Sequence, residues 1–218
     1  TVESFLPDTV RANEALFDRF PSYVLSFEGA YRYQLLAEHH PELFARVRAR
    51  VAEGRWEPAG SALEAFDANL PAPESIVRQI LYGRRWFERE LGRAGCDLLL
   101  PDCFGFPASL PTIAAHCGVI GFSTQKLRKG ATLRSAFGVP FHFGLGNGPD
   151  GSELLAVLDP GEYGVGPEED LGDGEAQRAR FAELDSAERP ARRMTYFGVG
   201  DQGGALPPAA VERIERSR

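Results

Sequence analysis

The sequence predicts an α/β fold in which short, mostly parallel strands alternate with helices. Short apolar segments such as residues 98–100 alternate with longer segments of helical periodicity such as residues 73–91. Each apolar segment gives way to polar residues at its carboxyl end, where α/β enzymes place their functional groups. This regular alternation favours a parallel sheet or barrel over a mixed sheet.

The helices are predicted from apolar side chains that recur every three or four residues. In chain order these segments are residues 10–20, residues 30–53 with an interruption at Pro41, residues 73–91, residues 109–117 and an amphipathic segment at the C-terminal end. The third is the clearest, because its apolar residues share one side of the helix and Gly92 follows as a stop signal.

The strands are predicted from apolar or alternating runs that are bounded by turn residues. In chain order these runs are residues 23–27, 55–60, 98–100, 119–124, 141–145, 154–158 and 194–199. The turn-rich sequence GNGPDG joins the fifth strand to the sixth. Residues 159–175 have few apolar anchors and predict a surface loop, and residues 177–193 show a weak helical pattern.

Composition and charge exclude several classes of function. Hydrophobic residues make up 43% of the chain and charged residues 25%, as in ordinary soluble globular proteins. The net charge of −7 and the lack of a basic block disfavour binding to nucleic acid. No apolar run approaches the roughly 20 residues that span a bilayer, so no membrane partner is expected. The three cysteines lack metal-type spacing and predict reduced thiols, and both cytoplasm and periplasm remain open as compartments.

The segment LLLPDCFGFPASLP carries the strongest functional signal in the chain. Asp102 follows a buried strand directly and stands beside an aromatic residue and a glycine, which is where an α/β enzyme places a catalytic carboxylate. An alternative is that Asp102 only caps the next helix, because aspartate is a favoured N-cap residue. The neighbouring Cys103 is interpreted as a small buried residue rather than a nucleophile.

Several further acids also stand near the predicted carboxyl ends of strands. In a parallel barrel these ends open on one face, which would bring together Glu28, Glu64, Asp67, Asp102, Lys126 and Asp201. Glycoside hydrolysis needs two carboxyl groups, one to attack or to activate water and one to protonate the leaving oxygen. The same acids could instead bind a hard cation, and Glu28 and Glu64 could simply be solvated.

Three segments in fixed order resemble the catalytic domain of the α-mannosidases of glycoside hydrolase family 38. They are RWEPAGSALEAFDANLPAPESIVRQILYGRRWFERELG, LLLPDCFGFPASLPTIAAHCGVIGFSTQKL and YFGVGDQGGALP. The resemblance covers most of residues 1–218 and implies a seven-stranded (β/α) barrel, of which this chain would form a part. It also implies a divalent metal, usually zinc, and retaining hydrolysis of α-mannosidic bonds in a mannose-containing oligosaccharide or glycan.

The resemblance implies roles for individual residues. Asp102, in the motif PDxFG, would be the nucleophile and also a metal ligand. Phe104 would pack on the sugar, and Lys126, in the TQK segment, would line the site. Asp201 is the candidate general acid/base, although Gln202 stands where some relatives carry a second carboxylate.

The loop ALEAFDANLP supplies two further candidates for substrate binding, Glu64 and Asp67. This loop lacks the tryptophan–valine–glutamate run that is common in the family and has Leu63-Glu64-Ala65 instead. This departure from the family's pattern leaves the roles of Glu64 and Asp67 open.

The two ends of the chain predict a piece of a longer protein. The chain begins at Thr1, and its C-terminal sequence VERIERSR stops inside an amphipathic pattern. The family's HxD metal motif would precede Thr1, and a further histidine ligand would follow Arg218. We therefore expect a single incomplete barrel domain over residues 1–218 that is inactive alone, with hydrolysis belonging to the full-length protein. A non-catalytic carbohydrate-binding pseudoenzyme, another barrel carbohydrate hydrolase and a homo-oligomer stay open.

Overall fold

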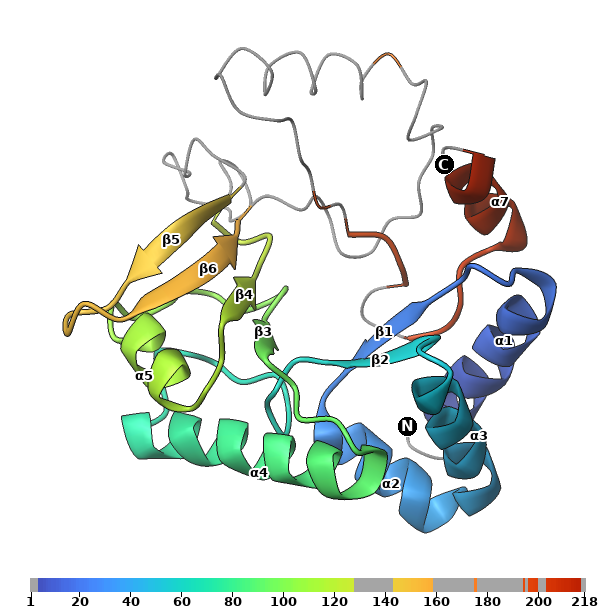
Figure 1. Cartoon of the computed structure of the whole chain (residues 1–218), viewed down its shortest axis with the longest axis horizontal. Coiled ribbons are helices and arrows are strands. Elements are labelled where there is room, and N and C mark those ends of the chain that lie inside the picture. Colours follow the sequence, from blue (N-terminus) through green and yellow to red (C-terminus); the bar gives the residue numbers. More distant parts are fainter. Residues whose placement is uncertain are drawn as a thin grey trace.

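The computed structural model describes residues 4–127, 143–158, 175, 194, 196–199 and 203–216 (Figure 1). The helices are α1 (Phe5–Arg19), α2 (Ala30–His39), α3 (Pro41–Ala52), α4 (Pro73–Leu91), α5 (Leu110–His116) and α7 (Pro208–Arg216). The strands are β1 (Leu25–Glu28), β2 (Trp56–Ala59), β3 (Asp97–Leu99), β4 (Gly121–Ser123), β5 (Phe143–Asn147) and β6 (Glu153–Val157). Within these described residues, no helix combines the length and the apolar character that a bilayer crossing requires.

The described strands form two sheets, and all but one of their pairings are parallel. β1 pairs with β2, and the second sheet has the order β3-β4-β6-β5. The predicted α/β alternation is thus confirmed, whereas the expectation of a purely parallel sheet is wrong at β5, which runs antiparallel to β6. The reason is the short turn between them, closed by a 2.8 Å hydrogen bond from Gly148 N to Ser152 O. A connection this short reverses the chain, because parallel neighbours need a long crossover.

The described residues do not form a closed barrel, and the sequence predicted only part of one. The two sheets meet where the loop after β2 contacts the start of β3, since Ser61 N donates a 2.7 Å hydrogen bond to Asp97 O. The six described strands form an open arrangement with helices around the outside (Figure 1). The strand predicted over residues 194–199 is also wrong for residues 194 and 196–199, which lie in no strand. Residues 159–174 and 176–193, predicted as loop and weak helix, lie outside the described residues.

Helix α4 belongs to two hydrophobic cores. Its C-terminal half inserts Trp86 and Phe87 into a core formed by α1, α2, α3, α7 and the β1–β2 sheet. Its N-terminal half inserts Ile76 and Ile80 into a second core with β3, β4, β6 and α5. In Figure 1 this helix runs along the bottom of the molecule, from α5 to α2. The two groups of strands are therefore supported by one helix.

Gly83 allows α4 to lie against the loop that follows β2. A Cβ atom at this position would be 2.3 Å from Ser61 O and 2.4 Å from the carbonyl carbon of Ala62, both of them backbone atoms. In the space that the glycine leaves, Leu63 N donates a 2.8 Å hydrogen bond to Gln79 O. The loop that carries Glu64 is thus fixed to the helix backbone.

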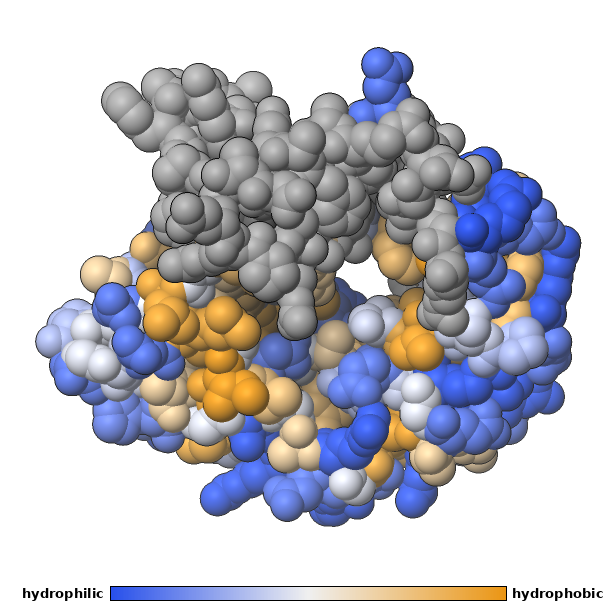
Figure 2. Space-filling view, turned by 45° about the horizontal axis from the view of Figure 1, so that its top comes forward, coloured by the Kyte–Doolittle hydropathy of each residue, from blue (hydrophilic) through white to orange (hydrophobic). Residues whose placement is uncertain are grey.

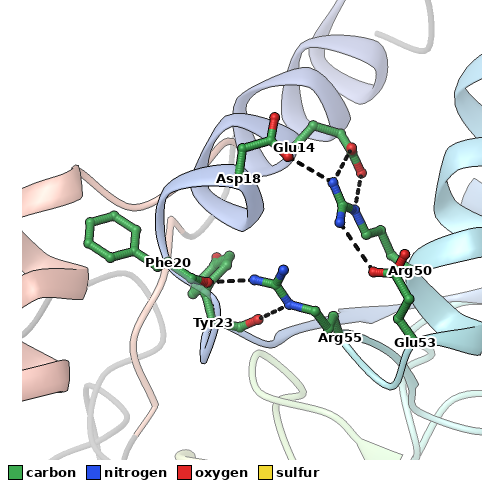
Figure 3. Close-up of polar contacts among 7 residues, drawn as sticks. All are labelled: Glu14, Asp18, Phe20, Tyr23, Arg50, Glu53 and Arg55. Carbon is green, nitrogen blue, oxygen red and sulfur yellow. Dashed lines mark hydrogen bonds and ion pairs between the residues drawn. The ribbon is translucent and has the colours of Figure 1, made fainter.

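Two arginines join α1 to the elements around the β1–β2 sheet (Figure 3). Arg50 of α3 is only 18% exposed and donates hydrogen bonds of 3.2 and 3.0 Å to the two carboxylate oxygens of Glu14. These bonds raise the pKa of the Arg50 guanidinium above its ordinary value, against the opposing effect of burial. Arg55 donates to the backbone oxygens of Phe20 and Tyr23, at the turn between α1 and β1. Bidentate, charge-assisted pairs of this kind fix geometry as well as adding stability.

An apolar surface lies on the side of the molecule that carries β5 and β6 (Figure 2, orange). Leu154 and Ala156 are buried in the core that includes α5. Because side chains alternate along a strand, the register partners Leu145 and Leu155 point to the opposite face. They are 59% and 52% exposed.

Candidate active site

Asp102 lies in a loop at the carboxyl end of β3. The backbone continues past the strand for one further hydrogen bond, from Leu100 N to Ser123 O at 3.0 Å, before Pro101 and Asp102 turn away. Helix α5 has Ser109 at its N-cap position, so the alternative in which Asp102 caps that helix is wrong. The carboxylate is instead presented at the strand end with 48% of its side chain exposed.

The structure brings Asp102, Phe104 and Lys126 together. Lys126, just after β4, places its ammonium 2.6 Å from Asp102 Oδ1 and 4.5 Å from the centroid of the Phe104 ring. Only 11% of the Lys126 side chain is exposed, whereas Phe104 as a whole is 70% exposed. The buried cation offsets the negative charge of the carboxylate and also lies within cation–π range of the ring. An exposed ring beside a carboxylate is suited to packing against the apolar face of a sugar.

Cys103 holds the loop rather than reacting. Its sulfur accepts a hydrogen bond from Ala68 N at 3.4 Å, and its thiol donates to Gly105 O at 3.3 Å. Burial raises the pKa of this thiol, with smaller opposing contributions from the backbone, which disfavours the nucleophilic thiolate. At Gly105 a Cβ would lie 2.4 Å from Asn69 Nδ2, so the loop around residues 64–70 lies directly against the Asp102 loop. The interpretation of Cys103 as a buried residue is confirmed.

Glu64 and Asp67 have different surroundings in that neighbouring loop. Asp67 Oδ1 accepts hydrogen bonds from Asn69 N at 2.7 Å and Leu70 N at 3.0 Å, so this side chain shapes its own turn. Glu64 Oε1 instead pairs with Arg32 Nη2 at 2.8 Å. Of the two predicted substrate-binding residues, Glu64 therefore forms an ion pair with a side chain, and Asp67 accepts hydrogen bonds from backbone nitrogens of its own turn.

Arg32 is a residue that sequence reasoning missed. It lies in the first turn of α2 and pairs with both Glu64 and, at 3.1 Å, Glu28 Oε1 at the end of β1. The only signal in the sequence was the spacing of four residues between Glu28 and Arg32, which is ordinary for a surface ion pair. Burial raises the pKa of the Glu28 carboxyl, while Arg32 lowers it by a smaller amount.

A small pocket opens between the carboxyl ends of β1, β2 and β3. It is lined by Glu28, Gly29, Gly60, Ala62, Glu64, Ala65 and residues 98–100. Next to this lining, the Asp97 carboxylate accepts hydrogen bonds from the backbone nitrogen of Gly60 at 3.2 and 3.3 Å, and burial raises the pKa of Asp97. The pocket shares the backbone of residues 98–100 with the loop of Asp102, so both belong to the same end of the strands.

Two predicted components, the general acid/base and the metal site, are not seen within the described residues. Asp201, the candidate general acid/base, lies outside the described residues, as does Gln202. Within the described part of the chain, no group of three or more His, Cys, Asp or Glu side chains is arranged to hold a metal. A zinc site needs three or four nitrogen, oxygen or sulfur ligands. The described residues, with Asp102 as the one predicted ligand, do not by themselves fit such a site.

Comparison with known proteins places the sequence among glycosidases. The family model for the "Glycosyl hydrolases family 38 N-terminal domain" matches residues 6–218. Alpha-mannosidase G of Dictyostelium discoideum is 32% identical over 197 residues, which are 90% of this chain and 17% of that protein. Alpha-mannosidase 2C1 of Homo sapiens is 32% identical over 202 residues, 92% of this chain and 19% of that protein. The chain thus spans less than a fifth of the length of these relatives.

The fold is also similar to a solved structure. The crystal structure of an alpha-mannosidase from Enterococcus faecalis V583 superposes with a TM-score of 0.72 at 19% sequence identity. The match covers 97% of this chain and 24% of that one. At this identity the likeness concerns the fold, and it agrees with the arrangement of strands and helices described above.

Proposed function

Because the chain belongs to the family of glycosyl hydrolase family 38 N-terminal domains, we propose that it forms part of the active site of a retaining α-mannosidase. The observation that carries the proposal is the contact of Asp102 with Lys126 and of Lys126 with Phe104 at the carboxyl ends of β3 and β4. This arrangement joins a carboxylate, a cation and an exposed ring within the reach of one sugar. The substrate is a mannose-containing oligosaccharide or glycan.

In the proposed mechanism, Asp102 attacks the anomeric carbon as the bond to the leaving oxygen breaks. A second carboxylic acid, for which Asp201 is the candidate, gives its proton to that oxygen, and water later hydrolyses the glycosyl–enzyme ester. Lys126 fixes the orientation of the Asp102 carboxylate before the attack, and Phe104 supports the sugar ring. Retention requires that the two carboxyl groups lie about 5–5.5 Å apart.

We also propose that the full-length protein binds a divalent metal, most simply zinc, and that further strands complete a seven-stranded barrel. Asp102 would contribute one metal ligand, and the other ligands would come from outside the described residues. Such an ion would supply Lewis-acid chemistry toward the hydroxyl groups of a sugar. The steps assigned above to Asp102, Lys126 and Phe104 do not depend on it.

The test replaces Asp102 in the full-length protein. Asp102→Asn keeps the size of the side chain but removes the nucleophile, and the rate of hydrolysis of p-nitrophenyl α-mannoside should fall by about 10³-fold or more. Asp150→Asn is the matched control, because Asp150 is a carboxylate on the β5–β6 turn that contacts Thr112 and His116 at the surface. It should leave the rate unchanged.

Two results would refute the proposal. Activity that survives in Asp102→Asn would remove Asp102 from the role of nucleophile. Release of β-mannose as the first product, detected by proton NMR, would exclude the retaining mechanism. Binding of mannosides without any hydrolysis by the unaltered protein would favour a carbohydrate-binding pseudoenzyme instead.

A further inference from the structure

A second charged cluster lies on the same face as Asp102. We call the three side chains Glu28, Arg32 and Glu64 the Arg32 cluster. The guanidinium of Arg32 bridges the two carboxylates at 3.1 and 2.8 Å. All three side chains are partly exposed, at 24% for Glu28, 36% for Arg32 and 33% for Glu64. A ligand at the strand ends could therefore reach each of them.

The Arg32 cluster borders the pocket between β1, β2 and β3. Glu28 and Glu64 are both in the pocket wall, together with Leu100, which precedes the Asp102 loop by one residue. Gly29 lets the charged side chains lie close to the backbone, because a Cβ there would lie 2.8 Å from Arg32 Nη1 and 3.2 Å from Glu64 Oε1. The backbone of Gly29 has φ +82°, a conformation that glycine adopts without cost. A larger residue at position 29 would therefore displace Arg32 and Glu64.

The charge of the cluster favours some ligands over others. Two carboxylates and one guanidinium give a net charge of −1, and the Asp97 carboxylate, hydrogen-bonded to the lining residue Gly60, adds negative charge nearby. Among the causes that raise the pKa of Glu28, after burial, are the charges of Glu64 and Asp97. Arg32 is thus already neutralised, and an incoming anion would meet excess negative charge. Like-charge juxtaposition of this kind is an effective means of excluding a ligand.

Resting on the function proposed above, we infer that the Arg32 cluster is a subsite for the group next to the reactive mannose, and that it selects uncharged, hydroxyl-bearing groups over anionic ones. Carboxylates accept hydrogen bonds from hydroxyl groups, and the guanidinium donates them to hydroxyl oxygens. Two neighbouring hydroxyl groups of a second sugar can donate to a carboxylate and accept from the guanidinium at the same time. A ligand that carried a carboxylate or phosphate at this position would have no hydrogen to donate to Glu28 and Glu64, so it could not use these two acceptors.

The experiment uses two substrates of similar size that differ in charge. These are 4-carbamoylphenyl α-mannoside, which is neutral, and 4-carboxyphenyl α-mannoside, which is anionic at neutral pH. With the full-length protein, we expect kcat/KM to be about tenfold higher for the neutral compound, the size expected of one unfavourable charge contact at a half-exposed site. The double variant Glu28→Gln/Glu64→Gln should bring this ratio to about one or below.

Two further arms separate charge from shape and from folding. The double variant Glu42→Gln/Glu74→Gln removes the same charge from exposed positions in α3 and α4, and it should keep the ratio of the unaltered protein. Gly29→Ala places a methyl group against Arg32 and Glu64, which displaces them, and should raise KM for both compounds by about tenfold. Its control is Gly54→Ala, which has a similar φ of +73° but no atom within 4 Å of the added Cβ.

The outcomes are distinct. Equal kcat/KM for the two compounds in the unaltered protein overturns the inference, as does an unchanged ratio in Glu28→Gln/Glu64→Gln. If that variant does not fold, an unchanged KM in Gly29→Ala overturns it. If neither compound is hydrolysed, the proposed function fails instead, and calorimetric binding of the two compounds decides the inference. Tighter binding of the neutral compound supports it, and equal binding or tighter binding of the anion overturns it.

Discussion

Replacement of Gly83 by alanine should loosen the contact between α4 and the loop of Glu64, although alanine is the better helix former. The added Cβ would lie 2.3 Å from Ser61 O, 2.4 Å from the Ala62 carbonyl carbon and 2.6 Å from Leu63 N. All three are backbone atoms, so no flexible side chain can yield. Either α4 or the loop after β2 must move away.

The expected size of the effect follows from opposing contributions. Alanine in place of glycine within a helix gains about 1 kcal/mol. Overpacking against rigid backbone costs about 1–3 kcal/mol. Movement of the loop also weakens two hydrogen bonds, from Leu63 N to Gln79 O and from Glu64 N to Gln79 Oε1, at about 1 kcal/mol each. We expect a net loss of about 2–4 kcal/mol in the free energy that opposes opening of this region.

Hydrogen exchange measured by mass spectrometry on the full-length protein tests this value. A loss of that size speeds exchange of the α4 amides and of the amides at 61–64 by about 30- to 1,000-fold. Glu88→Ala, at an exposed position of the same helix, should change the rates by less than about threefold. Unchanged or slower exchange in Gly83→Ala would refute the reasoning, because the loop would then yield at no cost.

Two further predictions concern buried titratable groups. Cys96 is exposed, whereas Cys103 and Cys117 are buried, and burial raises the pKa of both buried thiols. A thiol reagent at neutral pH should therefore modify Cys96 at least about tenfold faster than the two buried cysteines, as measured by peptide mass spectrometry. Fast labelling of Cys103 would contradict this prediction. Burial also raises the pKa of Asp97, so the folded state binds the carboxyl proton of Asp97 more tightly than the unfolded state does. Stability is therefore lost as the pH rises from the pKa of Asp97 in the unfolded state through its higher pKa in the folded state. Asp97→Asn should therefore gain stability relative to the unaltered protein between about pH 4 and about pH 7, measured by denaturant unfolding, and an equal difference at both pH values would exclude the effect.

Local pattern was sufficient for most of the secondary structure. The prediction for residues 73–91 matches α4, and the interruption at Pro41 separates α2 from α3 as expected. The prediction of a strand over residues 194–199 is wrong for the described residues, because a run of apolar side chains shows only that a segment could pair with another strand. Whether it does depends on partners that are distant in the sequence. The antiparallel β5 was deducible in principle, since the short turn after it was visible in the sequence.

The candidate site was predicted in part, and for a similar reason. Asp102, Phe104 and Lys126 stand at strand ends, so topology alone brought them to one face, and the structure places them in contact. The link between Arg32 and Glu64 joins residues from α2 and from a loop after β2, and no periodicity encodes it. Asp201 lies outside the described residues and stays a prediction.

The position of α4 in two hydrophobic cores has a consequence for communication within the site. Its N-terminal half packs beneath β3, which leads to Asp102, and its C-terminal half packs against the core of α2 and β1, which carry Arg32 and Glu28. A helix is stiff along its axis because each backbone hydrogen bond supports the next. The helix therefore links the positions of the two groups of strands. Asp102 and the Arg32 cluster are thus supported by the same helix, and a displacement of α4 would move the supports of both.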